Sequence, residues 1–237
     1  MEEILFGLLY IATIIVSAAI IPFSLRFYTK FPDEIYRKLL HIVALVALLV
    51  WTLVYDVWYY SVFTSIGAAL FFYVILILIE SINFFSKFMI ERKKGEFISS
   101  LFIMFLMYIS VTTICWGILD DRLLGICSIY AWGPGDAFAA IIGKSYGKHY
   151  LVGKHIEGTK SVEGTVSMFV VSFISILIVL LARGDMKWYA YLVIATVTAI
   201  VSTIAELFSL KGMDTIICPT ASMITIIILV YLFGGLA

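Results

Sequence analysis

The sequence predicts an all-α membrane protein: a polytopic bundle of about eight transmembrane helices with both termini outside the cytoplasm. Composition is the first observation behind this prediction. Of the 237 residues, 63% are hydrophobic and only 14% are charged, and the mean hydropathy is +1.09, a balance far from that of a soluble domain. The second observation is that the apolar residues form runs long enough to cross about 30 Å of hydrocarbon, which takes roughly 20 residues.

The apolar runs follow one another with polar connections between them. We expect helices at Ile4–Leu25, Leu39–Tyr55, Val57–Ile79, Phe97–Leu119, Leu123–Ile142, Val162–Ala182, Trp188–Phe208 and Thr215–Phe233. The first run lacks the basic start and the cleavage site of a secretory signal, so we interpret it as a retained span. Asp56 predicts a tight turn between the second and third spans. Because no linker or repeat divides the chain, we expect one integral-membrane domain over residues 1–237.

The charged residues give an independent test of this arrangement, since lysine and arginine concentrate in the cytoplasmic loops of membrane proteins. Of the 16 lysines and arginines, thirteen fall in the odd-numbered loops: Arg26, Lys30, Arg37, Lys38, Lys87, Arg92, Lys93, Lys94, Lys144, Lys148, Lys154, Lys160 and Lys211. The even-numbered loops hold Arg122, Arg183 and Lys187. We therefore predict that the odd loops face the cytoplasm.

This topology brings ionisable residues to the cytoplasmic ends of the spans. They come from separate parts of the sequence: His41, Glu80, Asp136, Glu163, Glu206 and Asp214. A single site that faces the cytosol could use all of them. Acids near helix ends also often face water or complement a helix N-terminus, and that alternative stays open for Glu163, Glu206 and Asp214.

The segment Gly133–Thr165 combines an acid in an apolar run with repeated glycine and lysine. Its pairs are Gly143-Lys144, Gly147-Lys148 and Gly153-Lys154, and Gly158-Thr159-Lys160-Ser161 follows them. Glycine lets backbone amides turn toward an anion and lysine adds a point charge, so such a loop suits phosphate. It is not a P-loop, because Phe138 stands where that motif needs its first glycine.

Asp136 is the strongest single indication of function, because an ionisable acid inside an apolar helix is costly unless it faces a polar cavity or partner. Gly133-Pro134-Gly135 directly before it should break or distort the helix, which is tolerated at membrane depth only where backbone lines protein or water. We predict that Asp136 holds Mg²⁺ against nucleotide phosphates. A protonated acid hydrogen-bonded between helices is the structural alternative.

Arg37-Lys38-x-x-His41 stands where a basic loop becomes a helix, so that Arg37 and His41 would share one face. The two cations could simply anchor the helix at the membrane surface. Anchoring does not need His41, which could bind phosphate as a cation or accept a proton as a neutral base.

Three motifs together resemble the polyprenol kinase family. They are Arg37-Lys38-x-x-His41, Gly135-Asp136-x-x-Ala139 with Gly143 seven residues after the acid, and Gly158-Thr159-Lys160-Ser161-x-Glu163-Gly164-Thr165. That family includes dolichol kinases, phytol kinases and CTP-dependent diacylglycerol kinases, and it is distantly similar to phosphatidate cytidylyltransferases. The resemblance covers Arg37 to Pro219. Near the last span the family often has Asp-Asn before a proline, whereas Asp214 here is followed by Thr215.

The resemblance implies phosphoryl transfer from CTP to a lipid alcohol in the bilayer, with Mg²⁺ as cofactor and no nucleic acid as partner. The catalytic candidates are Asp136, Glu163, His41 and Lys160, with Glu163 or His41 to orient or deprotonate the hydroxyl. The nucleotide-binding candidates are Arg37, Lys38, Gly143, Lys144, Gly147, Lys148, Gly158, Thr159, Lys160 and Gly164. The metal-ligand candidates are Asp136, Glu163 and Asp214.

The sequence leaves other functions open. The acceptor could be a polyprenol such as dolichol, a related isoprenoid alcohol, or diacylglycerol. Nucleotidyl transfer to phosphatidate is the next alternative, although the terminal signature of the cytidylyltransferases is absent. A transporter could also bury acids and interrupt helices, with Asp136 binding a coupling ion, but transporters usually concentrate such residues near the midplane.

Overall fold

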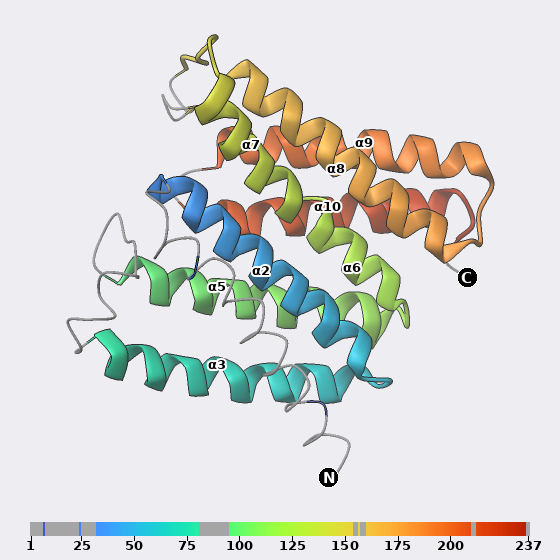
Figure 1. The fold of residues 1–237 in the computed structure, drawn as a ribbon. Coiled ribbons are helices and arrows are strands. Elements are labelled where there is room, and N and C mark those ends of the chain that lie inside the picture. The colour runs from blue at the N-terminus through green and yellow to red at the C-terminus, as the bar shows by residue number, and fades with distance from the viewer. Residues whose placement is uncertain are drawn as a thin grey trace. The chain divides into compact units, whose positions relative to one another are not determined.

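The computed structural model describes residues 32–80, 95–153, 156, 160–209 and 212–235, together with Gly7 and Ser24. Across these residues the regular structure is helical, and six helices are long and apolar enough to cross a membrane (Figure 1). An all-α protein with membrane-spanning helices is thereby confirmed. The first predicted span, Ile4–Leu25, lies outside the described residues except for Gly7 and Ser24.

The chain divides into two compact units, Met1–Thr113 and Ile114–Ala237. The first contains α2 (Asp33–Val54), α3 (Trp58–Glu80) and α5 (Glu96–Thr112). In this unit α3 packs against both α2 and α5 (Figure 1). The expectation of a single domain over the whole chain stays a prediction.

Helix α2 begins six residues before the predicted start at Leu39. Asp33 and Glu34 occupy its first turn, where carboxylates complement the partial positive charge of a helix N-terminus. Tyr36 is fully buried, so the early turns pack against the protein and do not form a polar loop. The motif that starts at Arg37 is therefore helical throughout.

A hydrogen-bonded cluster joins the three helices of the first unit. The buried hydroxyl of Tyr108 lies 3.0 Å from Thr52 Oγ1 and 2.7 Å from Ser61 Oγ, and Trp51 Nε1 donates to Thr64 Oγ1 at 2.9 Å. Between apolar helices, such hydrogen bonds hold neighbouring helices at one relative position, which apolar contacts alone do not specify. They set the packing of α2, α3 and α5.

A π-helical turn, Thr113–Ile118, follows α5 and leads into the second unit. Its helices are α6 (Arg122–Tyr130), α7 (Gly133–Tyr146), α8 (Val162–Arg183), α9 (Trp188–Phe208) and α10 (Asp214–Leu232). Every residue from Leu124 to Ile129 is buried, because α6 packs against both α8 and α10. Helix α9 packs against α8 and α10. The middle of α6 therefore lies in the core of this unit.

The predicted span Leu123–Ile142 is not one helix, and this corrects the sequence prediction. Helix α6 ends at Tyr130 and α7 begins at Gly133. Pro134 is in the first turn of α7, where its missing N–H costs no helical hydrogen bond. At the break, Ser202 Oγ donates to the Ala131 carbonyl at 2.9 Å. The distortion expected around Gly133-Pro134-Gly135 is thus a full interruption, stabilised by a neighbouring helix.

Helices α7 and α8 lie side by side at very short range (Figure 1). A Cβ atom on Gly164 would lie 2.8 Å from the Ala139 carbonyl oxygen, and one on Gly135 would lie 2.4 Å from Ser172 Oγ. Gly135, Ala139 and Gly143 are spaced by four and form the contact stripe of α7, a spacing typical of closely packed membrane helices. This contact fixes Asp136 relative to the start of α8.

The opposite face of α8 carries an exposed apolar ridge. Its residues are spaced by four and are 42% to 63% exposed: Val162, Val166, Val170, Ile174 and Ile178. Because a large exposed apolar surface is costly in water, this ridge suits contact with lipid chains. The burial pattern therefore agrees with a membrane location.

Candidate active site

An ion pair between Lys160 and Glu206 joins the segment before α8 to the last turn of α9. Lys160 Nζ lies 3.0 Å from Glu206 Oε1 and also donates to the backbone carbonyl of Glu206. The two side chains are only 15% and 12% exposed. Buried charges near the end of apolar helices are expensive and mark candidate functional sites.

Two further acids gather in the same region. Asp136, in the first turn of α7, is 6% exposed, and Asp214 is the first residue of α10. The charges of both, together with those of Glu206 and Lys160, act on the thiol of Cys218, one turn into α10. We call Asp136, Lys160, Glu206 and Asp214 the Lys160 cluster.

The Lys160 cluster contains more acids than bases. Its members are three carboxyl groups and one ammonium group in a largely buried region. Carboxylate oxygens are ligands that divalent cations prefer. The cluster therefore suits a ligand that carries such a cation.

Local backbone features explain why these side chains are placed here. The Asp136 N–H donates to the Trp132 carbonyl at 2.9 Å, so the acid begins the new helix directly after the break. On α10, buried Pro219 has no N–H to donate, so the carbonyl of Thr215 cannot receive its usual helical hydrogen bond. The interrupted helix and the proline both leave polar backbone close to the acids.

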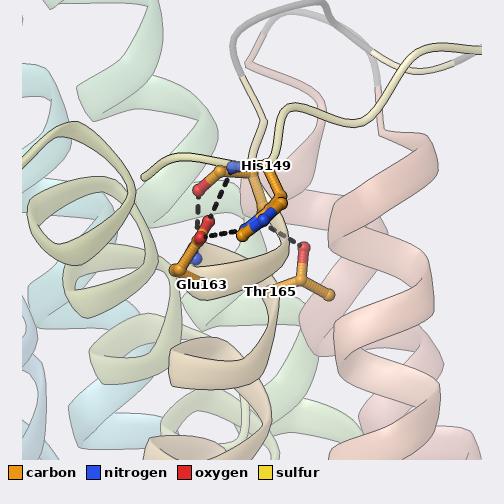
Figure 2. A network of polar contacts seen from close by, with 5 residues as sticks. His149, Glu163 and Thr165 are labelled. Atoms are coloured by element: carbon orange, nitrogen blue, oxygen red, sulfur yellow. Dashed lines mark hydrogen bonds and ion pairs between the residues drawn. The ribbon is translucent and has the colours of Figure 1, made fainter. Parts of the chain in front are cut away.

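Glu163 lies in a separate contact, with His149 in the loop before α8 (Figure 2). His149 Nδ1 is 2.7 Å from Glu163 Oε1, and the His149 N–H donates to Glu163 Oε2 at 3.4 Å. Thr165 lies beside the ring in Figure 2 and donates its hydroxyl proton to the Ser161 carbonyl at 3.0 Å. The structure therefore places Glu163 with the loop and brings Asp136, Lys160 and Asp214 together.

The two ends of this loop are tied to each other. Val162 N–H donates to the His149 carbonyl at 2.9 Å, and Leu151 N–H donates to the Lys160 carbonyl at 2.8 Å. Ser161 then caps α8 by accepting a hydrogen bond from the Gly164 N–H at 3.1 Å. Lys160 is thus held at the root of the loop. The predicted nucleotide-binding residues Gly158 and Thr159 lie outside the described residues.

The other glycines and lysines of the predicted phosphate loop separate into two groups. Gly143 and Gly164 are buried in the α7–α8 contact, where a Cβ on Gly143 would lie 3.6 Å from the Gly164 Cα. Close packing of the two helices is enough to explain glycine at these positions, without a bound ligand. Lys144 and Lys148 are exposed, and Gly147 follows the end of α7. The Lys144 and Lys148 side chains are accessible to solvent.

The predicted cations of the first unit lie on α2. Arg37 Nη1 is 3.2 Å from Glu34 Oε2, and Arg37 Nη2 is 3.6 Å from Glu96 Oε1 at the start of α5. Lys38 and His41 are half-buried on the same helix. Arg37 thus has two carboxylate partners, and its role in binding a nucleotide stays a prediction, as do those of Lys38 and His41.

For the magnesium prediction, the residues that the structure describes include no group of three His, Cys, Asp or Glu side chains able to hold a metal ion. Mg²⁺ in nucleotide sites usually has one or two carboxylates, with phosphate oxygens and water completing its shell. As carboxylates, Asp136 and Asp214 fit that donor set. Glu206 contacts Lys160, and Glu163 contacts His149.

The sequence includes Glu206 among the ionisable residues that one site could use, but it assigns Glu206 no individual role, and it gives no signal for His149. Comparisons of the chain with family models, with curated proteins and with solved structures found no match. The function is therefore argued from the chemistry of the site and from the motifs of the sequence.

Proposed function

We propose that this protein is a CTP-dependent kinase that phosphorylates a lipid alcohol within the bilayer, as its resemblance to the polyprenol kinase family implies. The observation that carries the proposal is the Lys160 cluster, which gathers three predicted site residues, Asp136, Lys160 and Asp214, near one end of an apolar helical unit. A buried ammonium beside carboxylates able to hold a cation is the combination that phosphoryl transfer uses.

In this reaction the alcohol oxygen forms a bond to the γ-phosphorus of CTP. The bond from that phosphorus to the bridging oxygen breaks, CDP leaves, and the alcohol proton passes to a base. Catalysis depends mainly on holding the two reactants in line and on neutralising phosphate charge. Glu163 and His41 remain the predicted candidates for the base, and Glu163 would act while it contacts His149.

Each described residue of the site has a proposed task. Asp136 and Asp214 would hold Mg²⁺, which would neutralise the phosphate oxygens. Lys160 would donate a hydrogen bond to the transferred phosphoryl group. The exposed Lys144 and Lys148 would attract the triphosphate from the cytosol. The resemblance assigns Arg37 and Lys38 to the same nucleotide.

The finer topology belongs to the same proposal. Eight spans with both termini outside would put the loop before α8, and with it the Lys160 cluster, on the cytoplasmic side, where CTP is available. The alcohol would reach the site from the bilayer, because a long prenyl or acyl chain need not leave hydrocarbon. The exposed apolar ridge of α8 supports such lateral contact with lipid.

The decisive experiment follows two labels. Detergent-solubilised protein is incubated with CTP labelled at either the γ or the α position, in the presence of prenols, diacylglycerol or phosphatidate. The proposal expects label from the γ position in a lipid monophosphate, with unlabelled lipid from the α position. Lipid labelled only from the α position would show nucleotidyl transfer and would refute the kinase.

A transporter is the second candidate, because α6 and α7 form an interrupted helix beside buried acids, as in many transporters. A transporter should transfer no label to lipid from γ-labelled or α-labelled CTP. It should instead take up a solute into proteoliposomes, and this uptake should depend on Asp136. Label transfer to lipid by the purified protein would exclude it as the main activity.

A further inference from the structure

We propose that Glu206 is a positioning residue of this site: it holds the Lys160 ammonium so that one N–H group points toward the phosphoryl group to be transferred. The inference rests on the proposed function and adds to it a residue that the sequence motifs did not assign. The evidence for this inference is the set of contacts that the Lys160 side chain makes.

An ammonium group has three N–H donors and no acceptor. Glu206 takes up two of them, one with Oε1 at 3.0 Å and one with its backbone carbonyl. Within the part of the chain that the structure describes, these are the contacts of the Lys160 ammonium. Among the described residues, one donor is therefore left for a ligand, and its direction is set by the other two.

Glu206 is itself held in place. It lies in the last turn of α9, where carbonyl groups lack helical donors and carry partial negative charge. Its carbonyl also accepts hydrogen bonds from Ser209 N at 3.2 Å and Ser209 Oγ at 2.8 Å. Lys160 is therefore bound both by a carboxylate and by the end of a helix, which gives its flexible side chain one defined position.

The pairing divides the acids of the Lys160 cluster between two tasks. Glu206 neutralises Lys160, so it is committed to the ammonium. Asp136 and Asp214, which lie in the same region, are the proposed ligands of a divalent cation. A ligand that brings both phosphate oxygens and a divalent cation suits a lysine donor that lies near two carboxyl groups.

The first test is the Glu206→Gln variant of the full-length protein, which keeps the side-chain volume and an oxygen acceptor but loses the charge. We expect kcat/KM for CTP to fall at least about tenfold, in line with a weakened charged contact. In a Lys160→Met background, Glu206→Gln should change kcat/KM less than about twofold, because the group that it positions is absent.

The matched control is Asp185→Asn at the other end of α8. Asp185 lies 3.1 Å from Arg183 Nη1, so it also loses a charged contact of similar length, and it has no role in the proposed site. Its kcat/KM should be unchanged. The inference is overturned if Glu206→Gln retains full kcat/KM, or if it lowers kcat/KM equally with and without Lys160.

A binding measurement separates this inference from the kinase proposal. Inorganic tripolyphosphate with Mg²⁺ should raise the melting temperature of the wild type and of Asp185→Asn, but not that of Lys160→Met, and less for Glu206→Gln. If the wild type transfers no phosphoryl group yet shows this pattern, the kinase proposal fails and the role of Glu206 stands. If Glu206→Gln is stabilised as strongly as the wild type, the role of Glu206 is refuted whatever the reaction.

Discussion

The two ends of α8 each carry a buried cation paired with carboxylates. At the start, Lys160 Nζ lies 3.0 Å from Glu206 Oε1, with side chains 15% and 12% exposed. At the end, Arg183 Nη2 lies 2.7 Å from Asp121 Oδ2, with side chains 10% and 13% exposed. By distance and burial the two pairs are alike, although 22 residues of helix separate them.

Their surroundings differ. Arg183 also pairs with Asp185 at 3.1 Å and donates to the Gly235 carbonyl, while Asp121 caps α6 by accepting from Leu124 N at 3.0 Å. Each of these contacts joins two parts of the protein, although the buried Arg183 Nη1 has no hydrogen-bond partner among the described residues. The pair therefore ties the start of α6, the end of α8 and the segment after α10 to one another.

At the Lys160 end, two further acids, Asp136 and Asp214, lie in the same region as the ion pair. Burial of an ion pair does not by itself indicate function. The distinguishing feature is the presence of these two acids near the Lys160 pair, because both are candidate metal ligands from the sequence.

The largest expected contrast between the two ends is an all-or-none difference in accessibility from the cytoplasm. Lys148→Cys should react with a membrane-impermeant thiol reagent only from the cytoplasmic side. Lys187→Cys, after the end of α8, should react only from the outside. Both positions are exposed and the native cysteines are buried. If both introduced cysteines react from one side, the proposed eight-span topology is wrong.

The next effect is on turnover. Asp136→Asn should lower kcat at least about 100-fold, because an amide of nearly equal volume cannot neutralise a metal-phosphate complex. The melting temperature should change little, since the variant keeps the shape of the side chain. Phosphoryl transfer at the wild-type rate by a folded Asp136→Asn protein would remove this acid from the site.

The contrast between the ends also shows how far the sequence could predict the molecule. Helix α9 has the predicted bounds Trp188–Phe208, and α8 starts at the predicted Val162. Both helices are long apolar runs with polar residues at their limits. The sequence singles out Asp136 for its apolar surroundings and its place after Gly133-Pro134-Gly135. In the structure Asp136 is 6% exposed, and it lies in the first turn of α7, not two turns inside a continuous helix.

What the sequence could not predict depends on tertiary contacts. Lys160 and Glu206 are 46 residues apart, and their pairing follows from how α8 and α9 pack. His149 and Glu163 are 14 residues apart, and their contact follows from the path by which the loop returns to α8. Helical spacing describes neighbours three or four residues apart, so neither pair leaves a local pattern.

A smaller effect, on stability alone, is expected at the Arg183 end. Arg183→Met should destabilise the protein by about 3 kcal/mol, because it leaves Asp121 buried without its partner. For a chain of this size that corresponds to a fall of roughly 6 to 12 °C in melting temperature. At a temperature where the variant is folded, its kcat and KM for CTP should equal those of the wild type. A large loss of kcat would instead mean that the Arg183 end of α8 takes part in the reaction.

The smallest effect is expected at the loop contact, and it also decides what Glu163 does. His149 is 77% exposed, so its pair with Glu163 is screened by water, and His149→Ala should raise the KM for CTP only about threefold through a looser loop.

If Glu163 acts only through His149, Glu163→Gln should have the same small effect, and the double variant should be no worse than either single one. If Glu163 is instead the predicted metal ligand or base, Glu163→Gln should lower kcat by about 100-fold or more while His149→Ala does not. Measuring kcat and KM for the three variants therefore separates the two roles: a shared rise in KM makes Glu163 an anchor of the loop, and a loss of kcat confined to Glu163→Gln returns it to the catalytic group.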